Sequence, residues 1–290
     1  MASRYIPAYT EETLAVLSRP PWKLVQGIAN FRDIGGYPLK DDSGSVRRAF
    51  IYRSAEPSRI TDDGKILLRD TMKVSSTYDL RSIPELKRME KEAPIVEIEG
   101  ITRNFVPVFR DVDYSPENVA LRFKSYSSGD LTEAYRCILQ AGGKTAYRSI
   151  LSHILTRPND PLLIHCTVGK DRTGIITALI LLLAGVDDEV IAEEYALTTL
   201  GMESVKEAIW DHLIKQPVFA KGDAEAIQGL ENMLSSRKDT MLKTLKIIDK
   251  EFGGVREYLD KQCGFSGEEI ETIRKNIVCD EPPCFPPEVA

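Results

Sequence analysis

The segment from Pro161 to Ala184 places the narrowest limits on what this chain can fold into. It begins with the apolar run Pro161 to Ile164 and ends with the apolar run Gly174 to Ala184. The first run has the length of a buried strand, and the second is long enough to form a buried helix. The short polar stretch between them must therefore lead from the end of a strand into the N-terminus of a helix. The segment predicts a strand–loop–helix unit inside a folded core.

The loop between the two runs has the sequence HCTVGKDRTG, from His165 to Gly174. A loop at a helix N-terminus directs several backbone N–H groups towards one point, where they can hold an anion such as phosphate. The same positive field favours the thiolate form of Cys166, which is the nucleophilic form of cysteine. Arg172 adds a planar cation that can hold two phosphate oxygens at once. This combination predicts a cysteine-dependent phosphatase, in which Cys166 forms a thiophosphoryl-enzyme that water then hydrolyses.

The remaining residues of the loop are expected to bind the substrate or to support the loop. His165 is interpreted as a structural support rather than as an acid or a base. The hydroxyl of Thr173 is expected either to cap the helix or to donate a hydrogen bond to the sulfur of Cys166. The residues expected to bind substrate are Thr167, Val168, Gly169 and Lys170.

Four motifs, in order along the chain, resemble those of a known family. The pattern His-Cys-x5-Arg-Thr-Gly is the signature of the protein tyrosine phosphatase superfamily, and its Gly-Lys-Asp-Arg form is similar to the bacterial and fungal tyrosine phosphatase family 3. The other three motifs are Asn30–Tyr37 (NFRDIGGY), Arg53–Glu56 (RSAE) and Asp79–Ser82 (DLRS) with Glu85. The resemblance implies an α/β fold: a central, mostly parallel sheet flanked by helices, with a helical insertion and a helical C-terminal extension.

The resemblance also implies roles for single residues and a class of substrate. Asp171 is the implied general acid, which protonates the leaving group, while Asp79, Asp111 and Asp113 are alternatives. A lysine at the position of Lys170 recurs in phosphatases that act on phosphoinositides or inositol phosphates, so Lys170 contacts such a head group or else faces solvent. The implied activity is that of a protein tyrosine or dual-specificity phosphatase. A phosphoinositide or inositol phosphate phosphatase is the alternative, followed by a non-catalytic pseudophosphatase that binds phosphate.

Charged residues in the other motifs have open interpretations. Arg32 and Asp33 are expected to hold the loop around Gly35 and Gly36 in place. Arg53 and Arg81 are expected to form either a second anion-binding surface or buried ion pairs.

Composition and charge argue against several other classes of protein. The formal net charge of −6 argues against a partner nucleic acid, which would require an excess of cations. The sequence has no apolar stretch of transmembrane length and no apolar core of a signal peptide, although a transient contact with a membrane surface is compatible with it. The five cysteines form neither a disulfide framework nor a zinc pattern, and the three histidines suggest no metal site. We therefore predict a protein without cofactors in the cytoplasm, or alternatively the nucleus.

The order of predicted elements gives the organisation of the chain. An N-terminal arm (1–21) precedes the phosphatase domain (22–279), and an irregular tail (280–290) follows it. The domain includes a helical insertion at about 111–157 and a helical extension at about 201–279. A helix predicted between two strands indicates a parallel crossover. The predicted strands are 25–31, 49–53, 74–80 and 97–108, and the predicted helices are 60–70, 116–126, 132–141, 144–156, 187–200, 203–215, 223–235, 240–258 and 267–277.

Overall fold

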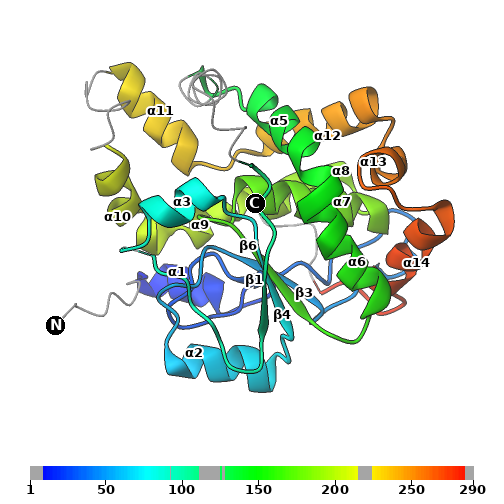
Figure 1. Cartoon of the computed structure of the whole chain (residues 1–290), viewed down its shortest axis with the longest axis horizontal. Helices are drawn as coiled ribbons and strands as arrows, with labels where there is room; N and C mark the ends of the chain where they lie inside the picture. The colour runs from blue at the N-terminus through cyan, green and yellow to red at the C-terminus, as the bar shows by residue number, and fades with distance from the viewer. Residues whose placement is uncertain (1–8, 92, 111–124, 126–127, 215–223, 285–290) are drawn as a thin grey trace.

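A five-stranded sheet lies at the centre of the fold (Figure 1). The structure is a computed structural model that describes residues 9–91, 93–110, 125, 128–214 and 224–284. The strands of the sheet are β1 (Arg32–Asp33), β3 (Ile51–Ser54), β4 (Ser76–Asp79), β5 (Thr102–Phe105) and β6 (Leu162–His165). They lie in the order β1-β3-β6-β4-β5. Only β1 is antiparallel to its neighbour, which confirms the predicted mostly parallel sheet.

Three parallel strands end together at one edge of the sheet. Ser54 of β3 and Asp79 of β4 are both paired with His165, the last residue of β6. Ligands of α/β proteins bind beyond the carboxyl ends of such strands. The RSAE and DLRS motifs therefore lie beside the cysteine loop.

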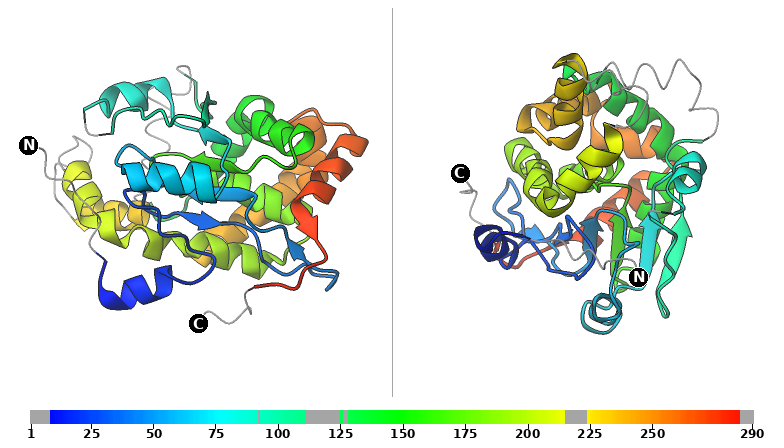
Figure 2. Two further views of the ribbon diagram at one scale, coloured as in Figure 1. Left: turned by 90° about the horizontal axis from the view of Figure 1, so that it is seen from below. Right: turned by 90° about the vertical axis from the view of Figure 1, so that its left-hand side faces the viewer.

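Helices cover both faces of the sheet (Figures 1 and 2). On β6, Leu162 and Ile164 pack against helices of one face, whereas Leu163 packs on the other face in a cluster with Leu68. This follows from the alternation of side chains along a strand, which allows an apolar strand to serve two cores. One face carries α2 (Asp62–Ile66) and η1 (Leu67–Thr71). The other carries α5 (Thr132–Gly142), η3 (Gly143–Tyr147), α6 (Arg148–Thr156), α7 (Asp171–Ala184), α8 (Asp188–Ala196) and α12 (Lys238–Phe252).

Local sequence explains where several helices begin and end. Thr61 accepts a hydrogen bond from the Gly64 N–H and so caps α2, within the helix predicted at 60–70. Gly185 ends α7 in the left-handed conformation, with φ +98°. The helix predicted at 240–258 is instead two helices, α12 and α13, because Gly253 and Gly254 adopt φ +73° and +88°. The remaining helices are α1 (Glu11–Leu17), α3 (Ile83–Arg88), α9 (Thr198–Gly201), α10 (Glu203–Leu213), α11 (Ala224–Leu234), α13 (Val255–Lys261) and α14 (Gly267–Ile277).

Two predicted strands are wrong or too long. The stretch 25–31 consists of turns, because Gly27 and Asn30 adopt φ +89° and +57°, which an extended strand does not allow. The strand predicted at 97–108 is reduced to β5, since Gly100 turns the chain at φ +81° just before it. Two short helices, α1 and α3, were not predicted. The helix predicted at 116–126 lies almost entirely outside the described residues.

A second, two-stranded sheet joins distant parts of the chain. β2 (Ser45–Val46) is antiparallel to β7 (Val278–Cys279). The division into arm, domain and tail stays a prediction. No helix within the described ranges combines the length and apolarity needed to cross a bilayer.

Candidate active site

The cysteine loop leads directly from the central strand into α7. Cys166 follows the last residue of β6 and is 1% exposed, so its thiol lies in the interior of the fold. α7 begins at Asp171, three residues earlier than predicted, and Arg172 therefore belongs to its first turn. The structure thus brings Cys166 and Arg172 to the N-terminus of one helix, where the helix dipole favours anions.

The backbone of the loop has its carbonyl groups turned outwards and held there. Three consecutive carbonyl oxygens accept hydrogen bonds from outside the loop: Thr167 from the N–H of Glu56 (3.1 Å), Val168 from Nδ2 of Asn30 (2.9 Å) and Gly169 from Nη2 of Arg53 (2.6 Å). The N–H groups of the same three residues donate no hydrogen bond within the described part of the chain. These N–H groups are consequently available to an anion.

Gly169 allows the loop to approach β3 closely. Its φ is +68°, in the left-handed region, and a Cβ atom there would lie 2.2 Å from the carbonyl oxygen of Ser54. A residue with a side chain would therefore have to displace backbone atoms of the neighbouring strand. The glycine fixes the distance between the loop and the end of β3.

Two buried arginines and one buried glutamate support the loop from behind. Nε of Arg32 donates to Oε1 of Glu194 over 2.7 Å, and Nη1 of Arg53 donates to Oε2 over 2.5 Å. Of the two interpretations of Arg53, the buried ion pair is therefore confirmed. Burial and the charge of Arg53 lower the pKa of Arg32 to about 10, which leaves Arg32 charged at neutral pH. Glu194, on α8, belongs to no motif and was not predicted.

Asp33 holds the turn after β1, as predicted. Its Oδ1 atom accepts a hydrogen bond from the N–H of Gly35 (2.8 Å), and its Oδ2 atom accepts one from the N–H of Ala49 (2.7 Å). Burial raises the pKa of this carboxyl to about 6 in spite of both donors. Asp33 is thus a structural residue.

Glu85, for which the sequence predicted no role, holds the arginine of the loop. Nη1 and Nη2 of Arg172 donate to its two carboxylate oxygens over 2.5 and 2.7 Å, and the hydroxyl of Thr167 donates to Oε1 over 3.0 Å. Burial alone would raise the pKa of Glu85, but the Arg172 guanidinium and the donors of Ser82 hold it well below its ordinary value. The bidentate pair fixes the plane of the guanidinium. The DLRS motif followed by Glu85 was the available signal.

The side chain of Lys170 does not face solvent, which was one of its two predicted positions. Its side chain is buried, and Nζ donates to the carbonyl oxygens of Met233 (2.5 Å) and Ser235 (3.1 Å). These carbonyls lie at the C-terminal end of α11, where unpaired carbonyl groups favour a cation. The side chain thus connects the loop to α11, and its predicted contact with substrate stays a prediction.

Thr173 makes neither of its predicted hydrogen bonds. Its hydroxyl is buried and has no hydrogen-bond partner among the described residues. The reason is positional: α7 begins before Thr173, so the residue lies inside the first turn rather than at the cap.

The structure excludes one alternative for the general acid. Asp79 is fully buried, and its carboxylate accepts hydrogen bonds from Arg81 (2.9 Å) and Arg103 (2.6 Å). Burial acts to raise the pKa of Asp79, but the neighbouring positive groups outweigh it and hold this pKa well below its ordinary value. An aspartate that stays ionised has no proton to donate. The alternatives Asp111 and Asp113 lie outside the described residues.

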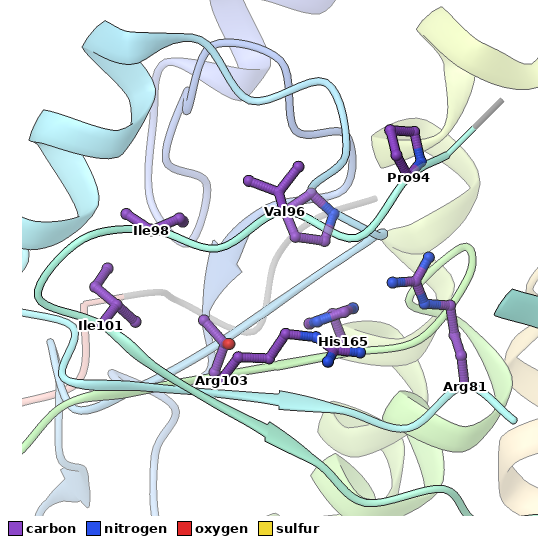
Figure 3. A pocket seen from close by; sticks show the side chains of 9 residues that line it. Arg81, Pro94, Val96, Ile98, Ile101, Arg103 and His165 are labelled. Atoms are coloured by element: carbon purple, nitrogen blue, oxygen red, sulfur yellow. The ribbon is translucent and has the colours of Figure 1, made fainter. Parts of the chain in front are cut away.

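A small pocket borders this ion-pair network (Figure 3). Figure 3 shows Arg81, Arg103 and His165 on one side of it and Pro94 and Val96 on the other. Arg81 pairs with Asp79 and also lies 3.7 Å from Glu56. The ion-pair interpretation is therefore confirmed for Arg81 as well, and two carboxylates offset the two guanidinium groups beside the pocket.

His165 is an uncharged, buried residue. Its Nδ1 atom lies 3.4 Å from the carbonyl oxygen of Cys166 and 3.9 Å from Oδ1 of Asp79. Burial lowers the pKa of His165 to about 4, even though Asp79 acts to raise it. The imidazole is thus neutral at physiological pH.

We expect this histidine to make the fold sensitive to mild acid. Between pH 6.5 and about 4 the unfolded chain binds a proton at position 165 that the folded chain does not, so the contribution of His165 to stability falls as the pH is lowered through this range. Asp33, whose pKa is raised by burial, acts in the opposite direction in both proteins compared below. The full loss is about 3 kcal/mol from the shift of His165. Urea unfolding of the protein and of His165→Gln at a series of pH values would measure it. His153, whose pKa burial also lowers, adds a loss of the same sign in both proteins. Equal pH slopes for the two proteins would contradict the prediction.

The sequence model of a protein family, the tyrosine phosphatase family, matches residues 23–279 of the chain. This chain belongs to the tyrosine phosphatase family. The matched range contains the cysteine loop and the three other motifs, so the family predicted from the motifs is confirmed.

Individual members of the family are similar over long stretches. The chain is 26% identical to the triple specificity protein phosphatase PtpB of Mycobacterium tuberculosis over 278 residues, which cover 86% of this chain and 96% of that protein. It is 30% identical to a tyrosine-protein phosphatase of Nostoc commune over 134 residues, or 45% of this chain and 44% of the other. A solved structure, the core catalytic domain of a PP-IP phosphatase from S. cerevisiae with citrate, matches 67% of this chain and 85% of its own, with 21% identity and a TM-score of 0.30.

Proposed function

We propose that this protein is a cysteine-dependent phosphoric monoester hydrolase that acts on phosphorylated proteins, as a tyrosine or dual-specificity phosphatase. The observation that carries the proposal is the loop between Cys166 and Arg172, with its carbonyl groups held outwards and the N–H groups of Thr167, Val168 and Gly169 left for an anion. The relatives from Mycobacterium tuberculosis and Nostoc commune are a triple specificity protein phosphatase and a tyrosine-protein phosphatase, which supports protein substrates.

In the first step the sulfur of Cys166 attacks phosphorus in line with the ester oxygen. The N–H groups of the loop and Arg172 hold the other three phosphate oxygens, whose charge they stabilise in the transition state. Glu85 holds Arg172 in place before the substrate arrives, so that little reorganisation is needed during the reaction. The step produces a thiophosphoryl-enzyme.

Asp171 serves as the general acid and then as the general base. It gives a proton to the leaving oxygen in the first step, which is worth about 10²- to 10⁴-fold in rate. It then takes a proton from the water that attacks the thiophosphoryl group, and the thiolate of Cys166 is released. All five cysteines are free, and the mechanism needs a reduced Cys166, so we place the protein in the reducing cytoplasm.

Phosphate release from three kinds of substrate tests the proposal. We expect faster turnover of a phosphotyrosyl peptide than of mono- or bisphosphorylated phosphoinositides in detergent micelles. Faster turnover of the lipids would contradict the proposed protein substrate, and no release from any of them would contradict hydrolysis. The rate with each substrate at saturation and at low concentration separates turnover from binding.

Replacement of Lys170 by methionine tests what this lysine does. Because its ammonium group connects the loop to α11, we expect kcat to fall by about tenfold for the peptide and by a similar factor for the lipids. A loss confined to phosphoinositides would instead show that Lys170 contacts the head group. Lys238→Met, on an exposed lysine paired with Glu193, is the control and should leave both rates unchanged.

A further inference from the structure

Two buried tyrosines connect Asp171 to other helices of the fold. The hydroxyl of Tyr135, on α5, donates a hydrogen bond to Oδ1 of Asp171 over 2.7 Å. The hydroxyl of Tyr195, on α8, is in turn hydrogen-bonded to the hydroxyl of Tyr135. The two rings meet edge to face, with centroids 6.3 Å apart, and both side chains are buried. Helices α5 and α8 are thus linked by hydrogen bonds to the carboxylate at the start of α7, although no sequence motif connects the three helices.

The number of available protons fixes the direction of these hydrogen bonds. A tyrosine hydroxyl carries one proton, whereas an ionised carboxylate can only accept. Tyr135 gives its proton to Asp171, so its oxygen must accept the proton of Tyr195. Burial, together with the charge of Asp171, raises the pKa of Tyr195 well above its ordinary value, and this tyrosine therefore keeps its proton.

The two oxygens of Asp171 consequently have different surroundings. Oδ1 accepts the hydrogen bond from Tyr135 and lies 3.5 Å from the ammonium group of Lys170. Oδ2 accepts no hydrogen bond from any residue that the structure describes, and the side chain is 18% exposed. A proton on Oδ1 would displace the bond from Tyr135 and face the charge of Lys170, whereas a proton on Oδ2 would do neither.

We propose that Tyr135 and Tyr195 are positioning residues that fix Asp171 so that its Oδ2 atom carries the proton exchanged in the reaction. The inference rests on the proposed function, in which Asp171 is the general acid. In the first step the proton passes from Oδ2 to the ester oxygen, while the bond from phosphorus to that oxygen breaks and the bond to the sulfur of Cys166 forms. In the second step a water proton passes to Oδ2, while the water oxygen bonds to phosphorus and the phosphorus–sulfur bond breaks.

The test compares two aryl phosphates with different leaving groups in the variant Tyr135→Phe. Phosphotyrosine has a poor leaving group that needs a proton, whereas the nitrophenolate of p-nitrophenyl phosphate departs with less help. We expect kcat/KM, which reports the steps up to release of the leaving group and not the shared hydrolysis of the thiophosphoryl-enzyme, to fall by about tenfold for phosphotyrosine and by less than about twofold for p-nitrophenyl phosphate. Tyr195→Phe should also slow phosphotyrosine more than p-nitrophenyl phosphate. The loss with phosphotyrosine should be only about threefold, because Tyr195 acts through Tyr135.

Tyr258→Phe is the matched control. It also removes a buried hydroxyl that bonds to α5, since the Tyr258 hydroxyl donates to the carbonyl oxygen of Leu139 over 2.6 Å. We expect Tyr258→Phe to change kcat/KM by the same factor for both substrates, relative to the unsubstituted protein. Equal slowing of both substrates in Tyr135→Phe, or no slowing, would overturn the inference. Thermal unfolding checks that each variant folds, and Tyr195→Phe carries the test if Tyr135→Phe does not.

Asp171→Asn separates this inference from the function on which it rests. Leaving-group-dependent loss in Asp171→Asn, but not in Tyr135→Phe, would overturn only the role of the tyrosines. A second outcome is that Asp171→Asn slows the two aryl phosphates equally, or slows neither, while phosphate release still depends on Cys166. In that case Asp171 would not be the general acid. The inference about the tyrosines would then fail, but the proposed hydrolase function would stand. The absence of any release that depends on Cys166 would refute the proposed function itself.

Discussion

Phosphate release is expected to fall by about 10⁴-fold or more when Cys166 is replaced by serine. A serine hydroxyl is not ionised at neutral pH and cannot replace the thiolate as the attacking group. The fold should survive, because one atom changes at a buried position and the carbonyl bonds of the loop do not involve the side chain. Phosphate release from a phosphotyrosyl peptide, together with thermal unfolding of both proteins, measures the effect.

Cys263 provides the matched control for this substitution. It is buried as deeply as Cys166, but burial raises the pKa of its thiol to about 12, so it stays protonated. We expect Cys263→Ser to keep its activity, and iodoacetate to alkylate Cys166 but not Cys263 in the folded protein. Phosphate should protect Cys166 from the reagent. Full activity in Cys166→Ser would refute covalent catalysis by this residue.

The largest loss of stability is expected at Glu194. Its replacement by leucine leaves the guanidinium groups of Arg32 and Arg53 buried together without a counter-charge. Breaking a buried ion pair by removing one partner costs about 3–5 kcal/mol. The free energy of unfolding in urea measures this loss. Because Arg53 also holds the carbonyl of Gly169, we expect the affinity for inorganic phosphate to fall as well.

The neighbouring residue offers a control of the same type on the same helix. Glu193 is 30% exposed and pairs with the exposed Lys238, so Glu193→Leu should cost less than about 1 kcal/mol. Similar costs for the two leucine variants would show that the buried cluster does not depend on the charge of Glu194. Glu194→Gln keeps two polar atoms but removes the charge, and we expect its loss in free energy of unfolding to lie between those of the two leucine variants.

Local patterns predicted the frame of the site because the relevant information is contiguous in the sequence. The apolar runs on either side of the loop gave β6 and α7, and the loop itself contains both Cys166 and Arg172. The starts of two predicted helices are also set locally: Thr61 caps α2, within the range 60–70, and Ser266 caps α14, which begins at residue 267 as predicted. In each case the interaction that decides the structure spans only a few residues.

Residues that act through distant contacts were not predictable in this way. Glu194 and Tyr135 lie on amphipathic helices, where a buried polar side chain resembles any other core position until the partners are known. Lys170 is the clearest case, because its charge within an anion-binding loop suggested a substrate contact. Its actual partners, at Met233 and Ser235, lie more than sixty residues away in the sequence. Only the tertiary fold brings the C-terminal end of α11 within reach of this lysine.

The strand order has a consequence for how the chain matures on the ribosome. β3 and β4 are never neighbours, since each is bonded to β6 and to an outer strand. Without β6, the only strand pairs of this sheet that the order leaves are β1 with β3 and β4 with β5, and these two pairs have no strand in common. β6 joins them, and Cys166 follows it directly. We therefore expect the proposed nucleophile to meet its anion-binding loop only when the two halves of the sheet are joined, so that an incomplete chain would lack the proposed catalytic centre.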